Sequence, residues 1–167
     1  MTLGYKKYFP GGEPTHFKEK VLLSHEHPLG EKVDVQIDNY DHIWHTNLYP
    51  KGHSICYDVH ERWRPGLDIH HVYGNLTKER NCFLVNKCVW VQRISIFEIP
   101  VVDEEEQKVD RDQPPMKVIM VNGRFMPWQK CLEIAINDGF DSLEHFFSFF
   151  NQDFSGKIII WDKKLRY

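Results

Sequence analysis

The 167-residue sequence contains no apolar run near the ~18 residues that cross a membrane, and its first residues, MTLGYKKYFP, lack the apolar stretch of a secretory signal. Its four cysteines include no CxxC pair. Without a signal, reduced thiols in a cytosol-like compartment are the expectation. We therefore expect a cytoplasmic protein with no membrane partner.

The sequence also has no large excess of positive or negative residues. The chain has 21 Lys and Arg against 24 Asp and Glu, a formal net charge of -3, so no global basic field attracts nucleic acid. Residues 103–112 (DEEEQKVDRD) hold six acidic and two basic residues, which leaves the remainder of the chain at +1. A local basic face on this nearly neutral body would bind a polyanion weakly unless it were concentrated.

Familiar catalytic and cofactor motifs are absent as well. The sequence has no glycine-rich phosphate loop, no GxSxG and no HExxH. His25-x-His27 and His42-x-x-His45 resemble metal-ligand spacings, but no spacing matches a zinc finger or ribbon. We therefore expect no metal and no cofactor, and we interpret these histidines as core or surface residues.

The composition is that of an ordinary globular domain, with 41% hydrophobic and 27% charged residues. General disorder is excluded, and the length fits a single domain over residues 1–167 that can bury a core without disulfides or a metal. Two segments interrupt the regular pattern of this domain. Residues 24–50 have no clean hydrophobic period and are predicted to be an irregular insertion, and residues 103–115 are predicted to be an acidic loop.

The order of hydrophobic periods predicts an α+β fold. Alternating and β-branched runs predict strands, whereas the C-terminal third carries apolar residues at helical spacing. This order favours a small mixed β-barrel with helices on its outside. The predicted strands are 2–8, 53–59, 67–73, 82–97 (bent or bulged), 117–121 and 157–161, and the predicted helices are 128–137 and 142–150, with a shorter one after Thr15 as its cap.

Turn and cap residues support these boundaries. Asn122-Gly123 predicts a two-residue hairpin turn within residues 117–127. Pro127 suits the first turn of a helix, and Gly139 suits the position just after its end. Asp141, with Glu144 three residues later, predicts the N-cap of the next helix.

A basic and aromatic cluster lies in residues 51–55 (KGHSI) and 62–66 (RWRPG). Guanidinium groups pair with phosphate and an indole stacks on bases, so the cluster suits an anionic, planar ligand. The same pattern is typical of a solvated surface hairpin with Trp63 packed in the core, and the residues alone favour that interpretation. The candidate nucleic-acid-binding residues are Lys51, His53, Arg62, Trp63, Arg64, Lys78 and Arg80.

Residues 138–144 (DGFDSLE) are explained mainly by capping. Gly139 ends one helix, Asp141 caps the next, and Phe140 is its hydrophobic staple. Asp138 is the acidic residue there without a structural role, so we retain it as a candidate functional residue.

Three segments together resemble a known family. The opening LGYKKYF, the KGHSI box before an RW-x-PG turn, and the ending AINDGFDSLEHFFSFFNQDFSGKIIIW are similar to ASCH domains of the PUA-like superfamily, most of all to ASCH-like proteins of bacteriophages and Bacteroidetes. The resemblance spans residues 2–9 and 49–161. It implies a small β-barrel with a cleft and an association with nucleic acid or nucleotides.

The resemblance also implies an enzymatic possibility. Small bacterial ASCH enzymes are amidohydrolases of N-acylated cytidine nucleosides that use a Lys, a Thr and a Glu. These positions correspond here to Lys51, Ser54 and Asp138, and Cys56 stands where the family's box ends in Arg. Serine keeps the hydroxyl and aspartate keeps a carboxylate one carbon shorter, whereas loss of the arginine removes an anion clamp.

The sequence favours a nucleic-acid or nucleotide-binding module, encoded by a phage or mobile element, with RNA expected rather than DNA. One alternative is an amidohydrolase in which Lys51, neutral through burial, activates Ser54 while Asp138 handles protons; little or no hydrolysis is expected from it. Another is an accessory protein that binds a host protein through its aromatic tail and acidic loop. Proximity of Lys51, Ser54 and Asp138 in the structure would favour the enzyme. A basic cluster around the cleft would favour nucleic-acid binding, and an exposed apolar patch would favour binding of a host protein.

Overall fold

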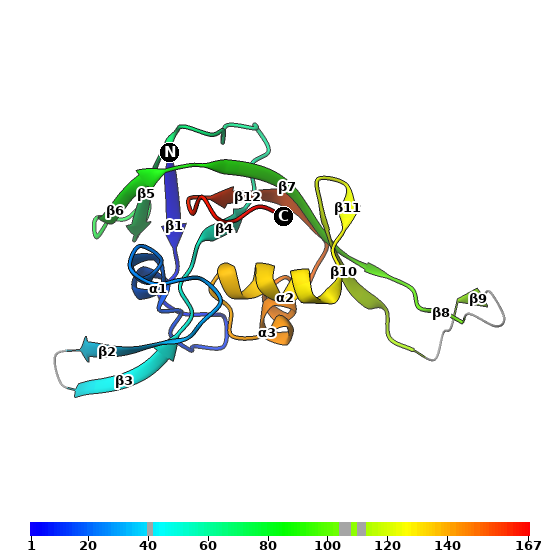
Figure 1. The fold of residues 1–167 in the computed structure, drawn as a ribbon, viewed down its shortest axis with the longest axis horizontal. Helices are drawn as coiled ribbons and strands as arrows, with labels where there is room; N and C mark the ends of the chain where they lie inside the picture. Colours follow the sequence, from blue (N-terminus) through cyan, green and yellow to red (C-terminus); the bar gives the residue numbers. More distant parts are fainter. Residues whose placement is uncertain (40–41, 104–107, 110–112) are drawn as a thin grey trace.

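The structure is a computed structural model that describes residues 1–39, 42–103, 108–109 and 113–167 (Figure 1). These residues form three helices and twelve strands, which confirms an α+β fold. Within these ranges, no helix has the length and apolar character needed to span a membrane. The elements are β1 (Thr2–Tyr5), α1 (Phe17–Leu23), β2 (Val33–Asn39), β3 (His42–Leu48), β4 (His53–Cys56), β5 (Asp68–Tyr73), β6 (Asn81–Lys87), β7 (Trp90–Ile99), β8 (Val102–Asp103), β9 (Lys108–Val109), β10 (Met116–Val121), β11 (Arg124–Phe125), α2 (Trp128–Asn137), α3 (Leu143–Phe149) and β12 (Phe154–Ile160).

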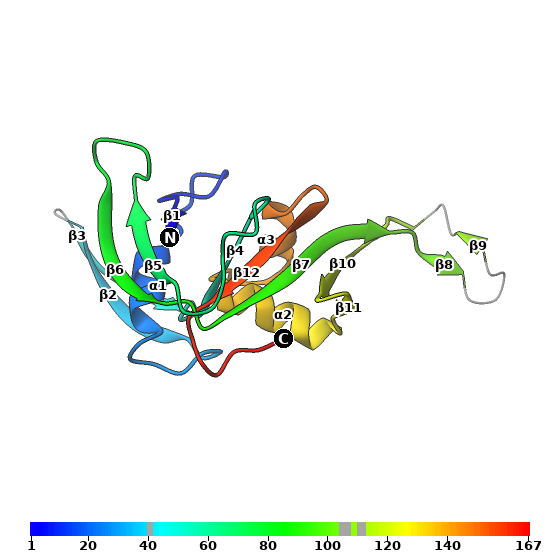
Figure 2. The ribbon, with the colours of Figure 1, turned by 90° about the horizontal axis from the view of Figure 1, so that it is seen from above.

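The strands belong to four sheets. A five-stranded sheet has the order β11-β10-β7-β12-β4, and a three-stranded sheet has the order β1-β5-β6, with β1 parallel to β5. The other two are the hairpins β2–β3 and β8–β9. Helices α2 and α3 lie on one side of the five-stranded sheet, and both views place β8 and β9 at the far end of the long β7–β10 pair (Figures 1 and 2). Across the described residues these ladders do not close into one barrel, so the barrel remains a prediction.

Strand β12 lies at the centre of the packing because it separates two hydrophobic cores. Successive side chains of a strand point to opposite faces. Ile158 and Ile160 accordingly pack into a core with α2 and α3, whereas Ile159 packs with Trp161 into a second core against β1 and β5. All three isoleucines are fully buried, so both faces of this β-branched strand stabilise the fold.

Local signals located most elements correctly. Helix α2 has the predicted bounds, and α3, β1, β4, β5, β10 and β12 fall within or overlap their predicted ranges. The Asn122-Gly123 turn is confirmed, with φ of 50° and 80°, and Gly139 ends α2 with φ of 92°.

Two predictions were wrong. Residues 24–50 are not irregular throughout, because they contain the paired strands β2 and β3. The long strand predicted at 82–97 is two strands, β6 and β7, which belong to different sheets. The chain changes sheets at Cys88 and Val89, whose amides donate to Leu67 and Ile160 respectively. Most of the predicted acidic loop lies outside the described residues.

Two helix caps also differ from prediction. The N-cap of α3 is Ser142 rather than Asp141, because the Ser142 hydroxyl accepts from the His145 amide at 3.1 Å. Thr15 does not cap α1. His16 occupies that position in a left-handed conformation. The Thr15 hydroxyl donates to the Lys6 carbonyl at 2.7 Å and accepts from the Phe17 amide at 3.4 Å.

We expect Phe146→Ala to lower the free energy of unfolding by about 3–5 kcal/mol, because the side chain is fully buried between α3 and the five-stranded sheet and its removal leaves a cavity. Urea denaturation measures the loss. Phe149→Ala, on the same helix but 37% exposed, is the control and should lose less. Equal losses in both variants would contradict this packing of α3.

Candidate functional site

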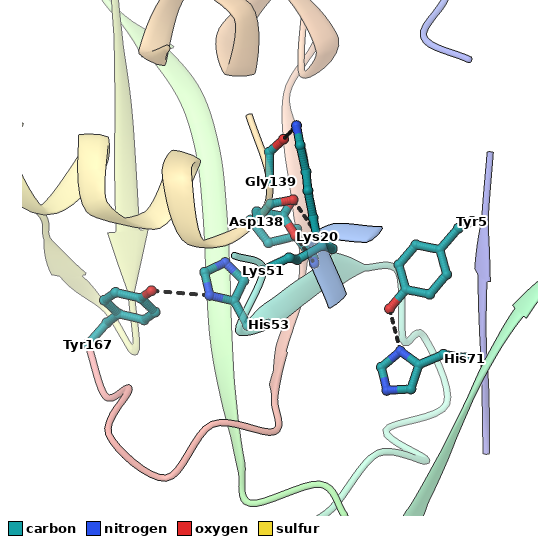
Figure 3. Close-up of polar contacts among 9 residues, drawn as sticks. Tyr5, Lys20, Lys51, His53, His71, Asp138, Gly139 and Tyr167 are labelled. Carbon is teal, nitrogen blue, oxygen red and sulfur yellow. Dashed lines mark hydrogen bonds and ion pairs between the residues drawn. The ribbon is translucent and has the colours of Figure 1, made fainter. Parts of the chain in front are cut away.

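The C-terminal end of α2 is held by two buried lysines from distant parts of the chain (Figure 3). A helix leaves its last carbonyl groups without partners, and cations are favoured there. Lys20 Nζ of α1 donates to the Gly139 carbonyl at 2.7 Å, and Lys51 Nζ contacts both the carbonyl and the carboxylate of Asp138. The Gly52 amide donates to Asn137 O at 3.0 Å. The α2–α3 turn is thereby tied to α1 and to the segment before β4.

Lys51 and Asp138 form an ion pair that is almost completely removed from water, with exposed fractions of 1% and 4%. Burial lowers the pKa of Lys51, although Asp138 opposes the change. Burial raises the pKa of Asp138 to about 6 despite the Lys51 ammonium. The Ile55 amide, one residue beyond Ser54, also donates to Asp138 Oδ1 at 3.3 Å. Asp138 is therefore ionised at neutral pH and close to taking a proton.

The three candidate catalytic residues meet at one small cavity. Lys51, Ser54 and Asp138 all line a cavity of about 150 Å³, which we call the inner hollow. Lys51 Nζ also lies 4.7 Å from the centre of the Phe17 ring. The structure thus brings together groups that are far apart in sequence. The aromatic residues that line the inner hollow are Tyr5, Tyr8, Phe9, Phe17, Phe140, Phe149 and Phe150.

A second cavity adjoins the first at Ser54. This outer hollow has a volume of about 600 Å³ and shares Gly4, Ser54 and Ile55 with the inner hollow. Residues of β1 and β4, which are edge strands of the two larger sheets, line both cavities. The two hollows together form a cleft between β1 and β4 with Ser54 where they join.

Tyr5, which the sequence did not single out, links the inner hollow to a buried histidine (Figure 3). Its hydroxyl lies 2.7 Å from His71 Nδ1, and His71 Nε2 lies 2.8 Å from Asn86 Oδ1. Burial lowers the pKa of His71 to about 4, so the ring is neutral at pH 7. With Nε2 donating to the Asn86 oxygen, Nδ1 accepts from Tyr5. No motif signals this pairing, because Tyr5 and His71 are brought together only by the β1–β5 pairing.

The predicted nucleic-acid-binding residues do not form one exposed face. Lys51 and His53 are buried, and Trp63 packs in the second core with only 7% exposure. Arg62 and Arg64 are exposed, but of the two only Arg62 lines the cleft. Lys78 and Arg80 are exposed in the segment between β5 and β6, outside both hollows.

His53 has a hydrogen-bond partner at one ring nitrogen, and its buried Nε2 has none among the described residues. Its Nδ1 lies 3.1 Å from the Tyr167 hydroxyl (Figure 3), and burial holds the pKa of its ring well below the usual range. Burial also raises the pKa of Cys56 to about 12, so this thiol next to the cleft is no thiolate nucleophile at neutral pH. Over the described side chains, no group of three or more His, Cys, Asp or Glu is placed to hold a metal ion.

No family model matches the chain, and neither a curated protein nor a solved structure shows significant similarity to it. The similarity to ASCH domains therefore stays a prediction from the sequence motifs.

We expect Lys51→Met to lower the free energy of unfolding by about 3–5 kcal/mol at pH 7.5, because it leaves the buried Asp138 carboxylate without its cation. The loss should shrink at pH 5. The folded-state pKa of Asp138 already lies above its unfolded value, and without Lys51 it rises further, so protonation favours the folded form as the pH falls.

The measurement is urea denaturation at both pH values. The double variant Lys51→Met/Asp138→Leu is the control and should recover most of the loss, because it removes both charges. Unchanged stability of Lys51→Met at pH 7.5 would contradict the structural role of the ion pair.

Proposed function

We propose that the cleft between β1 and β4 binds an N-acylated nucleoside and hydrolyses its amide bond, using Lys51, Ser54 and Asp138. The observation that carries this proposal is that the three residues line a single hollow although they come from separate segments of the chain. Nucleic-acid binding has less support, because its predicted basic residues are partly buried and otherwise dispersed.

We also infer that the two larger sheets are the halves of an incompletely closed PUA-like barrel. Their edge strands β1 and β4 line the same cleft, and β12 packs against both cores. In this arrangement the opening between the edge strands is the place where a ligand enters.

The charges of the site suit acyl transfer with roles that differ from those expected from sequence. Lys51 contacts the Asp138 carboxylate and so acts as a cation rather than as a neutral base. The Asp138 carboxylate takes the proton of Ser54, whose oxygen attacks the amide carbonyl carbon, while the Lys51 ammonium stabilises the negative charge on the carbonyl oxygen.

The C–N bond then breaks as the proton passes from Asp138 to the departing amine. Water hydrolyses the acyl–serine ester, and a carboxylic acid and free Ser54 are the products. The pKa of Asp138, about 6, suits both the removal and the return of a proton near neutral pH.

We expect the wild-type protein to release cytidine from N4-acetylcytidine, and Ser54→Ala to lower kcat/KM by at least ~100-fold, because the alanine has no hydroxyl to attack the carbonyl. Ser54→Thr keeps a hydroxyl and should retain part of the activity. Nucleoside release followed by chromatography measures the rates.

Ser155→Ala, at an exposed serine of β12, is the matched control and should behave as wild type. Absence of turnover by the wild type, or full turnover by Ser54→Ala, would overturn the proposed reaction.

The rate should also depend on pH through Asp138. Since the carboxylate must be ionised to accept the serine proton and its pKa is raised to about 6, kcat/KM should fall ~10-fold per pH unit below that value and level off above it. A pH–rate profile from pH 4.5 to 8, with circular dichroism to confirm folding at each pH, measures this. A flat profile from pH 5 to 7 would exclude Asp138 as the base.

A further inference from the structure

The two hollows of the cleft differ in size. Pockets for drug-sized ligands usually have volumes of about 300–1,000 Å³. The outer hollow, at about 600 Å³, falls in this range, whereas the inner hollow, at about 150 Å³, is too small for a whole nucleoside. A substrate that reaches Ser54 must therefore place only a small group in the inner hollow.

The inner hollow also selects by its chemistry. Phe9 and Phe140 are buried, and the Phe149 ring lies 5.4 Å from that of Phe140 and 5.1 Å from that of Phe150. These packed rings give a stiff apolar wall that resists expansion. Of the charged residues that line the hollow, Lys51 and Asp138 are paired with each other, and Lys6 is an exposed residue. A short hydrocarbon chain attached to a carbonyl matches this lining.

The outer hollow is lined by more polar and more exposed groups. Thr2, Arg62 and Asn75 line it and are exposed, and they offer hydroxyl, guanidinium and amide groups. The backbone of Arg62 is held in place, because its amide donates to Asp58 Oδ1 at 2.9 Å and the next residue, Trp63, is buried. Such a surface suits a sugar and a phosphate, since guanidinium groups bind phosphate through charge-assisted hydrogen bonds.

We propose that the cleft divides its substrate at the amide bond, with a short acyl group in the inner hollow and a nucleoside 5′-monophosphate in the outer hollow, its phosphate at Arg62. This division rests on the proposed hydrolysis at Ser54, the residue common to both hollows. The substrate class is thus N-acylated nucleotides with acyl groups of two or three carbons, and bulky acyl groups are excluded by size.

Acyl selectivity tests the inner hollow. Wild type should prefer N4-acetylcytidine to N4-benzoylcytidine by at least ~10-fold in kcat/KM, and Phe149→Ala should reduce this preference by ~10-fold or more because it enlarges the hollow. Phe149 is 37% exposed, so the variant can keep its fold. Phe125→Ala, on β11 and 60% exposed, lies outside both hollows and should keep the wild-type ratio. Equal use of both substrates by the wild type would overturn the size limit.

Phosphate recognition tests the outer hollow. Arg62→Ala should raise KM for N4-acetylcytidine 5′-monophosphate by roughly 10–100-fold, the worth of a charged hydrogen bond, and leave KM for N4-acetylcytidine unchanged. Arg124→Ala removes an exposed arginine of β11 and is the matched control. An equal rise in KM for both substrates, or no rise for either, would overturn the placement of the phosphate.

Binding to Ser54→Ala separates this division from the hydrolysis itself. In amide-detected NMR titrations, cytidine 5′-monophosphate should shift the signals of Arg62 and Asn75, and its N4-acetyl derivative should additionally shift those of Phe149 and Phe150. If the wild type shows no turnover, hydrolysis is refuted, and this pattern of shifts would still support the division. Shifts of Phe149 and Phe150 by the unacylated nucleotide would refute the division even in an active enzyme.

Discussion

The buried contact of Lys51 with Asp138 is the interaction on which the site depends. Removing two charges from water is unfavourable unless each finds the other in good geometry, and this happens only when the end of α2 meets the segment that leads into β4. Lys20 adds the same requirement from α1, because it contacts the next carbonyl, that of Gly139. The ion pair and Lys20 thus make the relative placement of these three elements specific, and Phe17, Lys51 and Asp138 from them line the inner hollow.

The cleft itself follows from how the sheets end. β12 buries both of its faces, so the two cores stay close together, while β1 and β4 remain edge strands of different sheets. Edge strands present unpaired backbone groups, which proteins usually cover or block. Here they border a cavity, and Ser54 lies on one of them. An opening between sheets that share a core therefore provides a ligand site without disturbing the packing behind it.

The sequence predicted the features of the fold that depend on neighbouring residues, such as helix ends and turns. The bounds of α2 and the Asn122-Gly123 turn follow from proline, glycine and asparagine conformations. The KGHSI motif singled out Lys51 and Ser54 as candidates, and both line the inner hollow. The features that the sequence did not predict depend on packing between residues far apart in the chain. Lys20 lies in a helix whose sequence, FKEKVLL, gives no sign that this ammonium is buried, and the pairing of Tyr5 with His71 depends on strands far apart in the chain. The division of residues 82–97 between two sheets had no local signal.

The pairing of β4 with β12 has a consequence for folding kinetics. His53 pairs with Ile160, and Thr2 pairs with His70, so the central ladders join segments that lie far apart in the chain. Closing long loops before their contacts form slows folding, and chains dominated by such pairings fold in about milliseconds to seconds. Lys51 and Asp138 are 87 residues apart, so their contact carries the same closure cost. The site therefore depends on long-range closure rather than on one local segment, and until the ladders form the edges of β1 and β4 are exposed to other chains.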